Sequence, residues 1–304
     1  MNVLYLIFNR PHLQTASFEQ IRAARPQRVF IAADGPRAGR DDDSKKCDEA
    51  RRIVDKIDWP CEVKTLFRDQ NLGCRRAISE AITWFFRHVE DGIIIEDDCV
   101  ASQAFFELAE SLLNYYRDEH QIWCISGSNF QNGQRRGDGS YYFSRYFHCW
   151  GWATWRRCWM HYDDDLLLWQ AVRESHSVRN AFMDEAEGNY WRQVWNDLLL
   201  PKPVVDTWDY RWSCATILNG GLTALPNGNL VTNIGFEGEG LHCFGKSPDP
   251  GLEAFDAKII HPTLMLRDIE ADQWTFKKIF GGEQIPFPKL LVQRIHRKLS
   301  RLLS

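Results

Sequence analysis

The segment Gly92-Ile-Ile-Ile-Glu-Asp-Asp-Cys-Val100 is an apolar run followed directly by three carboxylates, and the predicted fold is built around it. Consecutive isoleucines predict a buried β-strand, because β-branched side chains pack well in strands covered on both faces. Glu96, Asp97 and Asp98 repel one another unless a cation or hydrogen-bond donors balance their charge. Oxygen ligands of this kind suit Mg²⁺ or Mn²⁺, which would bridge to a substrate diphosphate. The alternative is that Asp98 or a neighbour caps the following helix.

Strands and helices alternate on both sides of that stretch through about the first 130 residues. Short runs rich in Ile, Val and Phe predict further strands at residues 3–8, 28–33, 61–67 and 122–126. Helical patterns lie between them, at residues 13–24, 43–56, 75–89 and 104–117. This alternation predicts an α/β fold, in which helices cover both faces of a mainly parallel sheet and ligands bind at the carboxyl ends of the strands.

The composition excludes several classes of protein. The chain has 304 residues, of which 44% are hydrophobic and 26% charged, and this balance indicates a globular protein. A formal charge of −4 argues against a nucleic-acid partner. Nine cysteines without a C-x-x-C pair favour reduced thiols and a cytoplasmic location over a disulfide framework or a structural zinc site. The longest stretch without a charge, residues 212–236, is too rich in Asn, Gly, Pro and Thr for a transmembrane helix.

Aromatic residues concentrate after residue 130. The chain has 13 tryptophans, which suit either a platform for carbohydrate stacking or a large core. Three of them lie in the tract Tyr141-Tyr-Phe-Ser-Arg-Tyr-Phe-His-Cys-Trp-Gly-Trp-Ala-Thr-Trp155. Within this tract, His148, Trp150 and Trp152 either line a binding site or belong to the core.

Motifs that are missing narrow the possible chemistry. The first strand leads into Asn9-Arg-Pro-His-Leu13 rather than a dinucleotide-binding G-x-G-x-x-G. The sequence also lacks the P-loop, the G-x-S-x-G nucleophile elbow and the H-E-x-x-H helix. What remains is a nucleotide-binding type of fold that handles phosphate through a metal and cationic side chains.

The chain resembles a GT-A-fold nucleotide-sugar glycosyltransferase in its short first strand, its Ala33-Asp34-Gly35 turn and its Glu96-Asp97-Asp98 triplet. The block Ile94-Ile-Glu-Asp-Asp-Cys-Val-Ala-Ser-Gln-Ala-Phe-Phe-Glu107, followed by Trp123-Cys-Ile-Ser126 and Gly151-Trp152, is similar to eukaryotic N-acetylglucosaminyltransferase I. It is also similar to bacterial family-2-type transferases of polysaccharide clusters. The resemblance covers about residues 3–245.

The resemblance implies roles for the residues at matching positions. Asp98 would coordinate Mn²⁺ (or Mg²⁺) bound to the diphosphate of a UDP-sugar donor, while Glu96 and Asp97 would contact the ribose or the donor sugar. Asp34 would accept a hydrogen bond from the uracil ring. Arg10 would lie beside the base or the phosphates.

Three further residues are candidates for contacts with phosphate. Arg75 and Arg76 would contact the diphosphate, unless they simply form an exposed helix face. His242 follows a polar, Gly-rich loop, and the resembled family orders such a loop on donor binding. We expect His242 to contact a phosphate or the metal, and the alternative is a packed or solvent-exposed ring.

An inverting transfer also needs a base that takes the proton from an acceptor hydroxyl. The segment Asp206-Thr-Trp-Asp209-Tyr-Arg-Trp212 occupies the position where the resembled enzyme carries a Trp-flanked acidic pair. Asp209 is therefore the first candidate for the base and Asp206 the second, although Tyr210-Arg211 stands where a second Asp is expected. The tryptophans would exclude water and stack on a sugar face. The alternative is that Asp209 caps a helix running to Asn219.

These features together predict a metal-dependent, inverting hexosyl- or N-acetylhexosaminyltransferase that acts on a glycan or a lipid-linked glycan. The alternatives are a sugar-nucleotide nucleotidyltransferase and a non-catalytic carbohydrate-binding protein. With no clear linker, we expect a single catalytic domain with a nucleotide-sugar-binding half at 1–130 and an acceptor-binding, catalytic half at 131–265. The extension at 266–304 ends in a basic amphipathic helix at 289–304, which either docks on the domain or binds a membrane surface peripherally.

Overall fold

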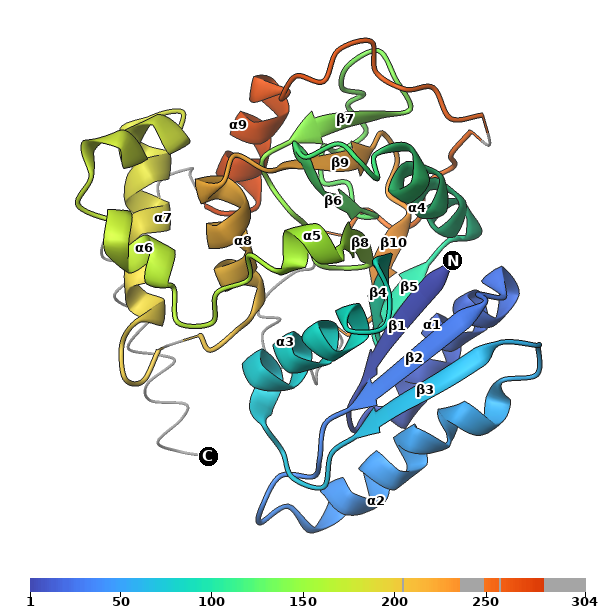
Figure 1. Ribbon diagram of the computed structural model, residues 1–304. Coiled ribbons are helices and arrows are strands. Elements are labelled where there is room, and N and C mark those ends of the chain that lie inside the picture. Colours follow the sequence, from blue (N-terminus) through green and yellow to red (C-terminus); the bar gives the residue numbers. More distant parts are fainter. Residues whose placement is uncertain (204, 236–248, 257, 282–304) are drawn as a thin grey trace.

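An eight-stranded sheet forms the centre of the computed structural model, which describes residues 1–203, 205–235, 249–256 and 258–281 (Figure 1). The strand order is β3-β2-β1-β4-β8-β6-β9-β7. Only β7 and β8 run antiparallel to the other strands, so the sheet is mixed but mostly parallel. Helices flank both faces, which confirms the predicted α/β class.

The strands of the first half follow the sequence prediction to within one or two residues at each end. They are β1 (Asn2–Ile7), β2 (Arg28–Ala33), β3 (Glu62–Phe67), β4 (Asp91–Glu96) and β6 (Ile122–Ser126). The apolar runs of β1, β2, β4 and β6 are buried, as expected for strands covered on both faces. The edge strand β3 is largely exposed.

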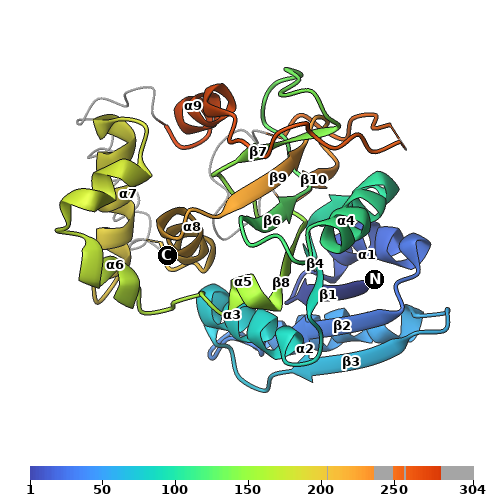
Figure 2. The ribbon, with the colours of Figure 1, turned by 45° about the horizontal axis from the view of Figure 1, so that its top comes forward.

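The predicted helices of the first half also form. They are α1 (Pro11–Ala24), α2 (Asp41–Arg51), α3 (Gly73–Phe86) and α4 (Gln103–Tyr115). The helix predicted at 43–56 ends as a 3₁₀ turn, η1 (Arg52–Lys56). Helix α1 packs against both α2 and α4 on one face of the sheet, while α3 lies on the other face with the short α5 (Arg156–Trp159) (Figure 2).

The aromatic tract forms strands of the same sheet. It contributes β7 (Tyr141–Ser144) and β8 (Trp152–Trp155), and β9 (Leu222–Pro226) lies between β6 and β7. Strand β8 inserts between β4 and β6 and is antiparallel to both. Most of the tryptophans, including Trp152, Trp155 and Trp159 of this tract and of α5, are buried. They therefore serve the core, and the carbohydrate-platform interpretation of the tryptophan content is wrong for them.

A group of helices lies on the side of the molecule away from β3 (Figures 1 and 2). It comprises α6 (Leu167–Val172), η2 (His176–Ala181), α7 (Glu185–Leu198), α8 (Asp209–Leu218) and α9 (Ile269–Lys278). These helices share a second hydrophobic cluster around Trp169, Trp191 and Trp195. No helix in the described ranges is long and apolar enough to cross a membrane.

A buried ion pair fixes α7 to the end of β7. The Glu187 carboxylate is fully buried, accepts hydrogen bonds from Arg145 Nη1 at 3.0 Å and from the Met183 amide at 2.6 Å, and also binds the Tyr146 hydroxyl. Removing one partner of such a pair leaves the other charge buried without compensation, which costs about 3–5 kcal/mol.

We therefore expect Glu187→Ala to lower the free energy of unfolding by about 3–5 kcal/mol, measured as a fall in the urea midpoint. Glu174→Ala is the control, because Glu174 is exposed, and it should change stability by less than about 0.5 kcal/mol. Equal midpoints for the two variants would contradict a structural role for the Arg145–Glu187 pair.

Candidate active site

The parallel register brings the candidate residues of the first half to one edge of the sheet. Ile7 of β1 lies opposite Ala33 of β2, and Leu6 lies opposite Glu96 of β4. Arg10, Asp34 and the carboxylate triplet therefore follow three neighbouring strands at their carboxyl ends, where open α/β sheets bind ligands.

Arg10 joins two of the three carboxylates. Its Nη1 lies 2.8 Å from Asp98 Oδ2, and its Nη2 binds Asp97 Oδ1. Both carboxylates are buried, and the Arg10 side chain is only 18% exposed. The guanidinium thus places a positive charge beside two of the three carboxylates, which would otherwise repel one another.

Both carboxylate oxygens of Asp97 accept hydrogen bonds from other residues of the chain. Its Oδ2 accepts the Phe8 amide at 3.3 Å, and its carbonyl accepts the Ser17 hydroxyl at 2.9 Å. Since its other carboxylate oxygen binds Arg10, Asp97 ties β4 to β1 and α1. A contact with ribose or sugar, which we predicted for Asp97, would compete with these bonds.

Asp98 sits at the start of a two-stranded ribbon formed by β5 (Cys99–Ala101) and β10 (Val231–Asn233). Its carbonyl accepts the Ile234 amide at 2.9 Å. Gly235 lies so close that an added Cβ would stand 2.4 Å from Asp98 Oδ2. A side chain at position 235 would push the Asp98 carboxylate aside. The sequence does not indicate this contact, because nothing local marks the approach of residue 235 to residue 98.

Asp209 follows Glu96 by 113 positions (209 − 96), yet its charge contributes to the raised pKa of Glu96. The pKa of Glu96 is raised, first by burial, then by the charge of Asp98, with smaller contributions from Asp97 and Asp209. The structure therefore brings the first candidate for the base into the neighbourhood of the carboxylate triplet.

Asp209 is the first residue of α8. One carboxylate oxygen, Oδ1, accepts both the Thr207 hydroxyl and the Tyr210 amide, the latter at 2.9 Å. No hydrogen bond to Oδ2 is found within the described ranges, so this oxygen has lone pairs for a proton. The flanking Trp208 and Trp212 are buried and pack against Trp152, so they close the core and are not available to stack on a sugar.

Arg75 and Asp206 form an ion pair with each other. Arg75 Nε lies 2.9 Å from Asp206 Oδ1, and Arg75 Nη1 lies 2.8 Å from Asp164 Oδ2. Arg211 also approaches Asp206, at 3.7 Å. This cluster anchors the segment before Asp209 to the beginning of α3. Arg76 instead pairs with Glu80 on the exposed face of the same helix, as its alternative interpretation expected.

Asp34 fastens the turn that precedes α3. Its carboxylate accepts the amides of Leu72 at 3.0 Å and Gly73 at 3.1 Å and the side-chain amide of Asn71 at 2.8 Å. The Gly35 amide adds a fourth donor at 2.9 Å. A hydrogen bond from a uracil ring, which we predicted for Asp34, would have to replace one of these donors.

The Asp98 carboxylate suits a cation that is also bound by phosphate. The described part of the chain contains no group of three or more His, Cys, Asp or Glu side chains that could hold a metal. Asp98 Oδ1 receives only the weak S–H donor of Cys99, at 3.5 Å, so it retains lone pairs. Mg²⁺ is commonly bound by one or two carboxylates together with substrate phosphates, and Asp98 fits that role. His242 lies outside the described residues.

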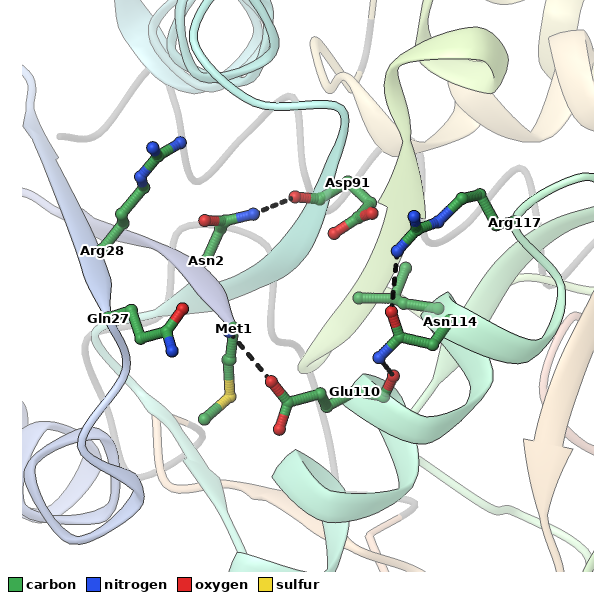
Figure 3. A pocket seen from close by; sticks show the side chains of 9 residues that line it. Met1, Asn2, Gln27, Arg28, Asp91, Glu110, Asn114 and Arg117 are labelled. Carbon is green, nitrogen blue, oxygen red and sulfur yellow. Dashed lines mark hydrogen bonds and ion pairs between the residues drawn. The ribbon is translucent and has the colours of Figure 1, made fainter.

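A pocket of about 330 Å³ lies at the opposite edge of the sheet (Figure 3). Its charged and polar groups partly pair with one another: the Met1 amino group lies 2.9 Å from Glu110, and Arg117 Nη2 lies 2.8 Å from Asn114 Oδ1. Because ligands bind at the carboxyl ends of parallel strands, this amino-end pocket is not the candidate site.

His148 is buried in the core rather than exposed in the candidate site. Its ring lies edge-on to the ring of Phe130, with 4.7 Å between the two ring centroids. Burial lowers the pKa of His148 to about 3. An unfolded histidine has a pKa near 6.5, so the unfolded state binds more protons at any pH between about 3 and 6.5. Burial of the neutral His148 ring therefore costs no stability above about pH 6.5. Below that pH the free energy of unfolding decreases, because the unfolded state takes up a proton that the folded state does not.

We therefore expect the wild type to lose up to about 2 kcal/mol more stability than His148→Gln between pH 7.5 and pH 5.0. Urea midpoints of both proteins at the two pH values measure the difference. His12→Gln, at an exposed position, is the control and should retain the wild-type pH dependence. An identical loss in wild type and His148→Gln would contradict the burial of a neutral ring.

The chain was compared with known families, curated proteins and solved structures. No protein-family model matches the sequence, and no curated protein sequence matches it. Among solved structures, the chain is similar to the mannosyltransferase PcManGT from Pyrobaculum calidifontis in complex with GDP-Man and Mn²⁺, with 13% identity and a TM-score of 0.36. That match covers 51% of this chain and 44% of the mannosyltransferase, so the chain matches less than half of that protein.

Two further structures match at a similar level. HddC from Yersinia pseudotuberculosis has 12% identity and a TM-score of 0.31, covering 51% of this chain and 77% of HddC. The 4-diphosphocytidyl-2C-methyl-D-erythritol synthase from Anaerococcus prevotii has 9% identity and a TM-score of 0.33, covering 61% and 80%. These similarities are too slight to carry a conclusion about activity.

Proposed function

We propose that this protein is a nucleotide-sugar glycosyltransferase of the inverting type. The observation that carries the proposal is the convergence of Arg10, the Glu96–Asp98 triplet and Asp209 at the carboxyl edge of the sheet. A diphosphate needs cations, and a transfer to a hydroxyl needs a base. Arg10 and the ion at Asp98 are our candidates for the first task, and Asp209 is our candidate for the second.

Each residue then has a distinct task. Arg10 contacts the diphosphate of a UDP-sugar, and Asp98 holds Mn²⁺ or Mg²⁺ together with phosphate oxygens. When bound, that ion neutralises the diphosphate and favours the departure of UDP. Asp209 Oδ2 takes the proton of an acceptor hydroxyl as the hydroxyl oxygen attacks the anomeric carbon and the bond from that carbon to UDP breaks.

The Arg75–Asp206 ion pair keeps Asp209 in place. Because Asp206 is committed to Arg75 and lies close to Arg211, we assign the base to Asp209 and a positioning role to Asp206. The acceptor is a glycan or lipid-linked glycan, and we propose that the protein is cytoplasmic. Residues 289–304 lie outside the described part of the chain, and their contact with a membrane stays a prediction.

Thermal unfolding with nucleotides tests the proposal directly. UDP, GDP, CDP and dTDP are each added with Mn²⁺, with Mg²⁺ and with EDTA. A ligand at about 100 times its Kd stabilises the native state by about 2.7 kcal/mol, which is readily measured. We expect stabilisation by UDP with Mn²⁺ and its loss in EDTA.

Other outcomes decide between the alternatives. No shift with any nucleotide and either metal would contradict the proposal and favour a carbohydrate-binding protein. Incubation with a nucleoside triphosphate and a sugar phosphate tests the remaining alternative, since release of inorganic diphosphate would identify a nucleotidyltransferase instead.

A further inference from the structure

The Arg10 guanidinium balances part of the negative charge of Asp97 and Asp98. The Arg10 guanidinium uses one nitrogen for each carboxylate, so it bridges the two side chains across the ends of β1 and β4. Both side chains are almost inaccessible to solvent: Asp97 is 2% exposed and Asp98 is 6% exposed.

The approach to Asp98 is covered on two sides. Arg10 lies 2.8 Å from Oδ2, and Gly235 packs against the same oxygen with no room for a side-chain carbon. A divalent cation that binds Asp98, at Oδ2 or at the more open Oδ1, would lie beside the guanidinium. The cation and the guanidinium compete for the same negative charge, and each weakens the binding of the other.

We infer that Arg10 is an exchangeable counter-ion that blocks metal binding until a diphosphate arrives. In the free protein it holds Asp97 and Asp98. When a nucleoside diphosphate binds, the guanidinium turns onto its phosphate oxygens and gives up Asp98 to the divalent cation, which binds as the partner of the diphosphate. The inference rests on the proposed function and adds an order of binding to it: the nucleotide opens the metal site.

The bond from Arg10 to Asp98 is the one given up. Asp97 keeps its bonds to the Phe8 amide and to Ser17 in either state, so it stays in place without the guanidinium. Asp98 keeps its backbone bond to Ile234 but loses its only charged partner in the described part of the chain. Guanidinium groups bind phosphate well because their N–H groups match two of its oxygens.

The test measures Mn²⁺ and UDP separately on the whole chain. Calorimetric titration with Mn²⁺ alone should show at least tenfold tighter binding to Arg10→Gln than to the wild type. Titration with UDP in EDTA should show at least tenfold weaker binding to Arg10→Gln. A general loss of folding does not produce changes of opposite sign, so the pair of titrations isolates the role of Arg10.

Two variants complete the design. Arg22→Gln is the matched control, since Arg22 also bridges carboxylates, Glu19 and Asp58, but on the exposed surface of α1, and it should match the wild type in both titrations. Arg10→Lys retains the charge and carries the test if circular dichroism shows that Arg10→Gln is unfolded. The lysine ammonium lacks the planar fork that reaches the two carboxylates with separate nitrogens, so it holds them less firmly and we expect Mn²⁺ to bind this variant at least threefold tighter than the wild type.

The outcomes separate this inference from the proposed function. Equal or weaker Mn²⁺ binding by Arg10→Gln, or by Arg10→Lys where that variant carries the test, overturns the inference whatever happens with UDP. Absence of UDP binding to the wild type, with or without metal, overturns the proposed function, and then the diphosphate-driven exchange fails with it. Tighter Mn²⁺ and weaker UDP binding by Arg10→Gln support the exchange.

Discussion

Asp209→Asn is expected to bind the UDP-sugar donor as the wild type does and to transfer the sugar about 10² to 10⁴ times more slowly. Asn keeps the shape of the side chain and can still accept hydrogen bonds from Thr207 and Tyr210 at Oδ1. What it loses is the second oxygen, which is the atom that takes the proton. The effect should therefore appear in kcat, with little change in donor affinity.

Release of UDP in the presence of an acceptor that supports wild-type turnover measures this effect. Asp206→Asn is the comparison, because Asp206 was the second candidate for the base and pairs with Arg75. A positioning residue should cost less in kcat than the base itself. A kcat of Asp209→Asn equal to that of the wild type would reject Asp209, and a larger loss in Asp206→Asn would transfer the role to Asp206.

Asp98→Asn is expected to abolish the stabilisation by UDP with Mn²⁺ and to lower turnover by about 10³-fold or more, since a bound metal contributes several kcal/mol to the transition state. The substitution weakens the ion pair with Arg10 but leaves the other contacts of residue 98 in place. The Ile234 amide binds the backbone carbonyl of residue 98, and an Asn side chain has the same size beside Gly235.

Asp91→Asn is the matched control for Asp98→Asn. Asp91 is the first residue of β4 and lies at the amino edge of the sheet, whereas Asp98 follows the carboxyl end of the same strand. The control therefore makes the same substitution at the edge of the sheet that lacks the candidate site. It should leave nucleotide binding unchanged in thermal unfolding. If Asp98→Asn retains the wild-type response to UDP with Mn²⁺ and the wild-type turnover, Asp98 does not hold the metal.

Several residues of the candidate site can be predicted from the sequence, but their contacts with one another cannot. The Glu96–Asp98 triplet and Arg10 were singled out because each follows a recognisable apolar strand, and parallel strands bring such residues together. Their mutual contact was not predictable, since 87 and 88 positions separate Arg10 from Asp97 and Asp98. The roles of Asp34 and Arg75 as structural anchors were missed for the same reason: their partners are remote in the chain.

The alternation of strands and helices in the first half, and hence the edge of the sheet that carries the candidate site, can be predicted from the amino-acid sequence. Local periodicity and buried apolar runs are enough for that, because neighbouring residues decide whether a segment forms a helix or a strand. Three features are visible only in the folded chain: β8 inserts antiparallel between β4 and β6, the tryptophans beside Asp209 face the core, and Arg10 covers Asp98. These features depend on pairing and packing between residues far apart in the chain, and no local pattern encodes them.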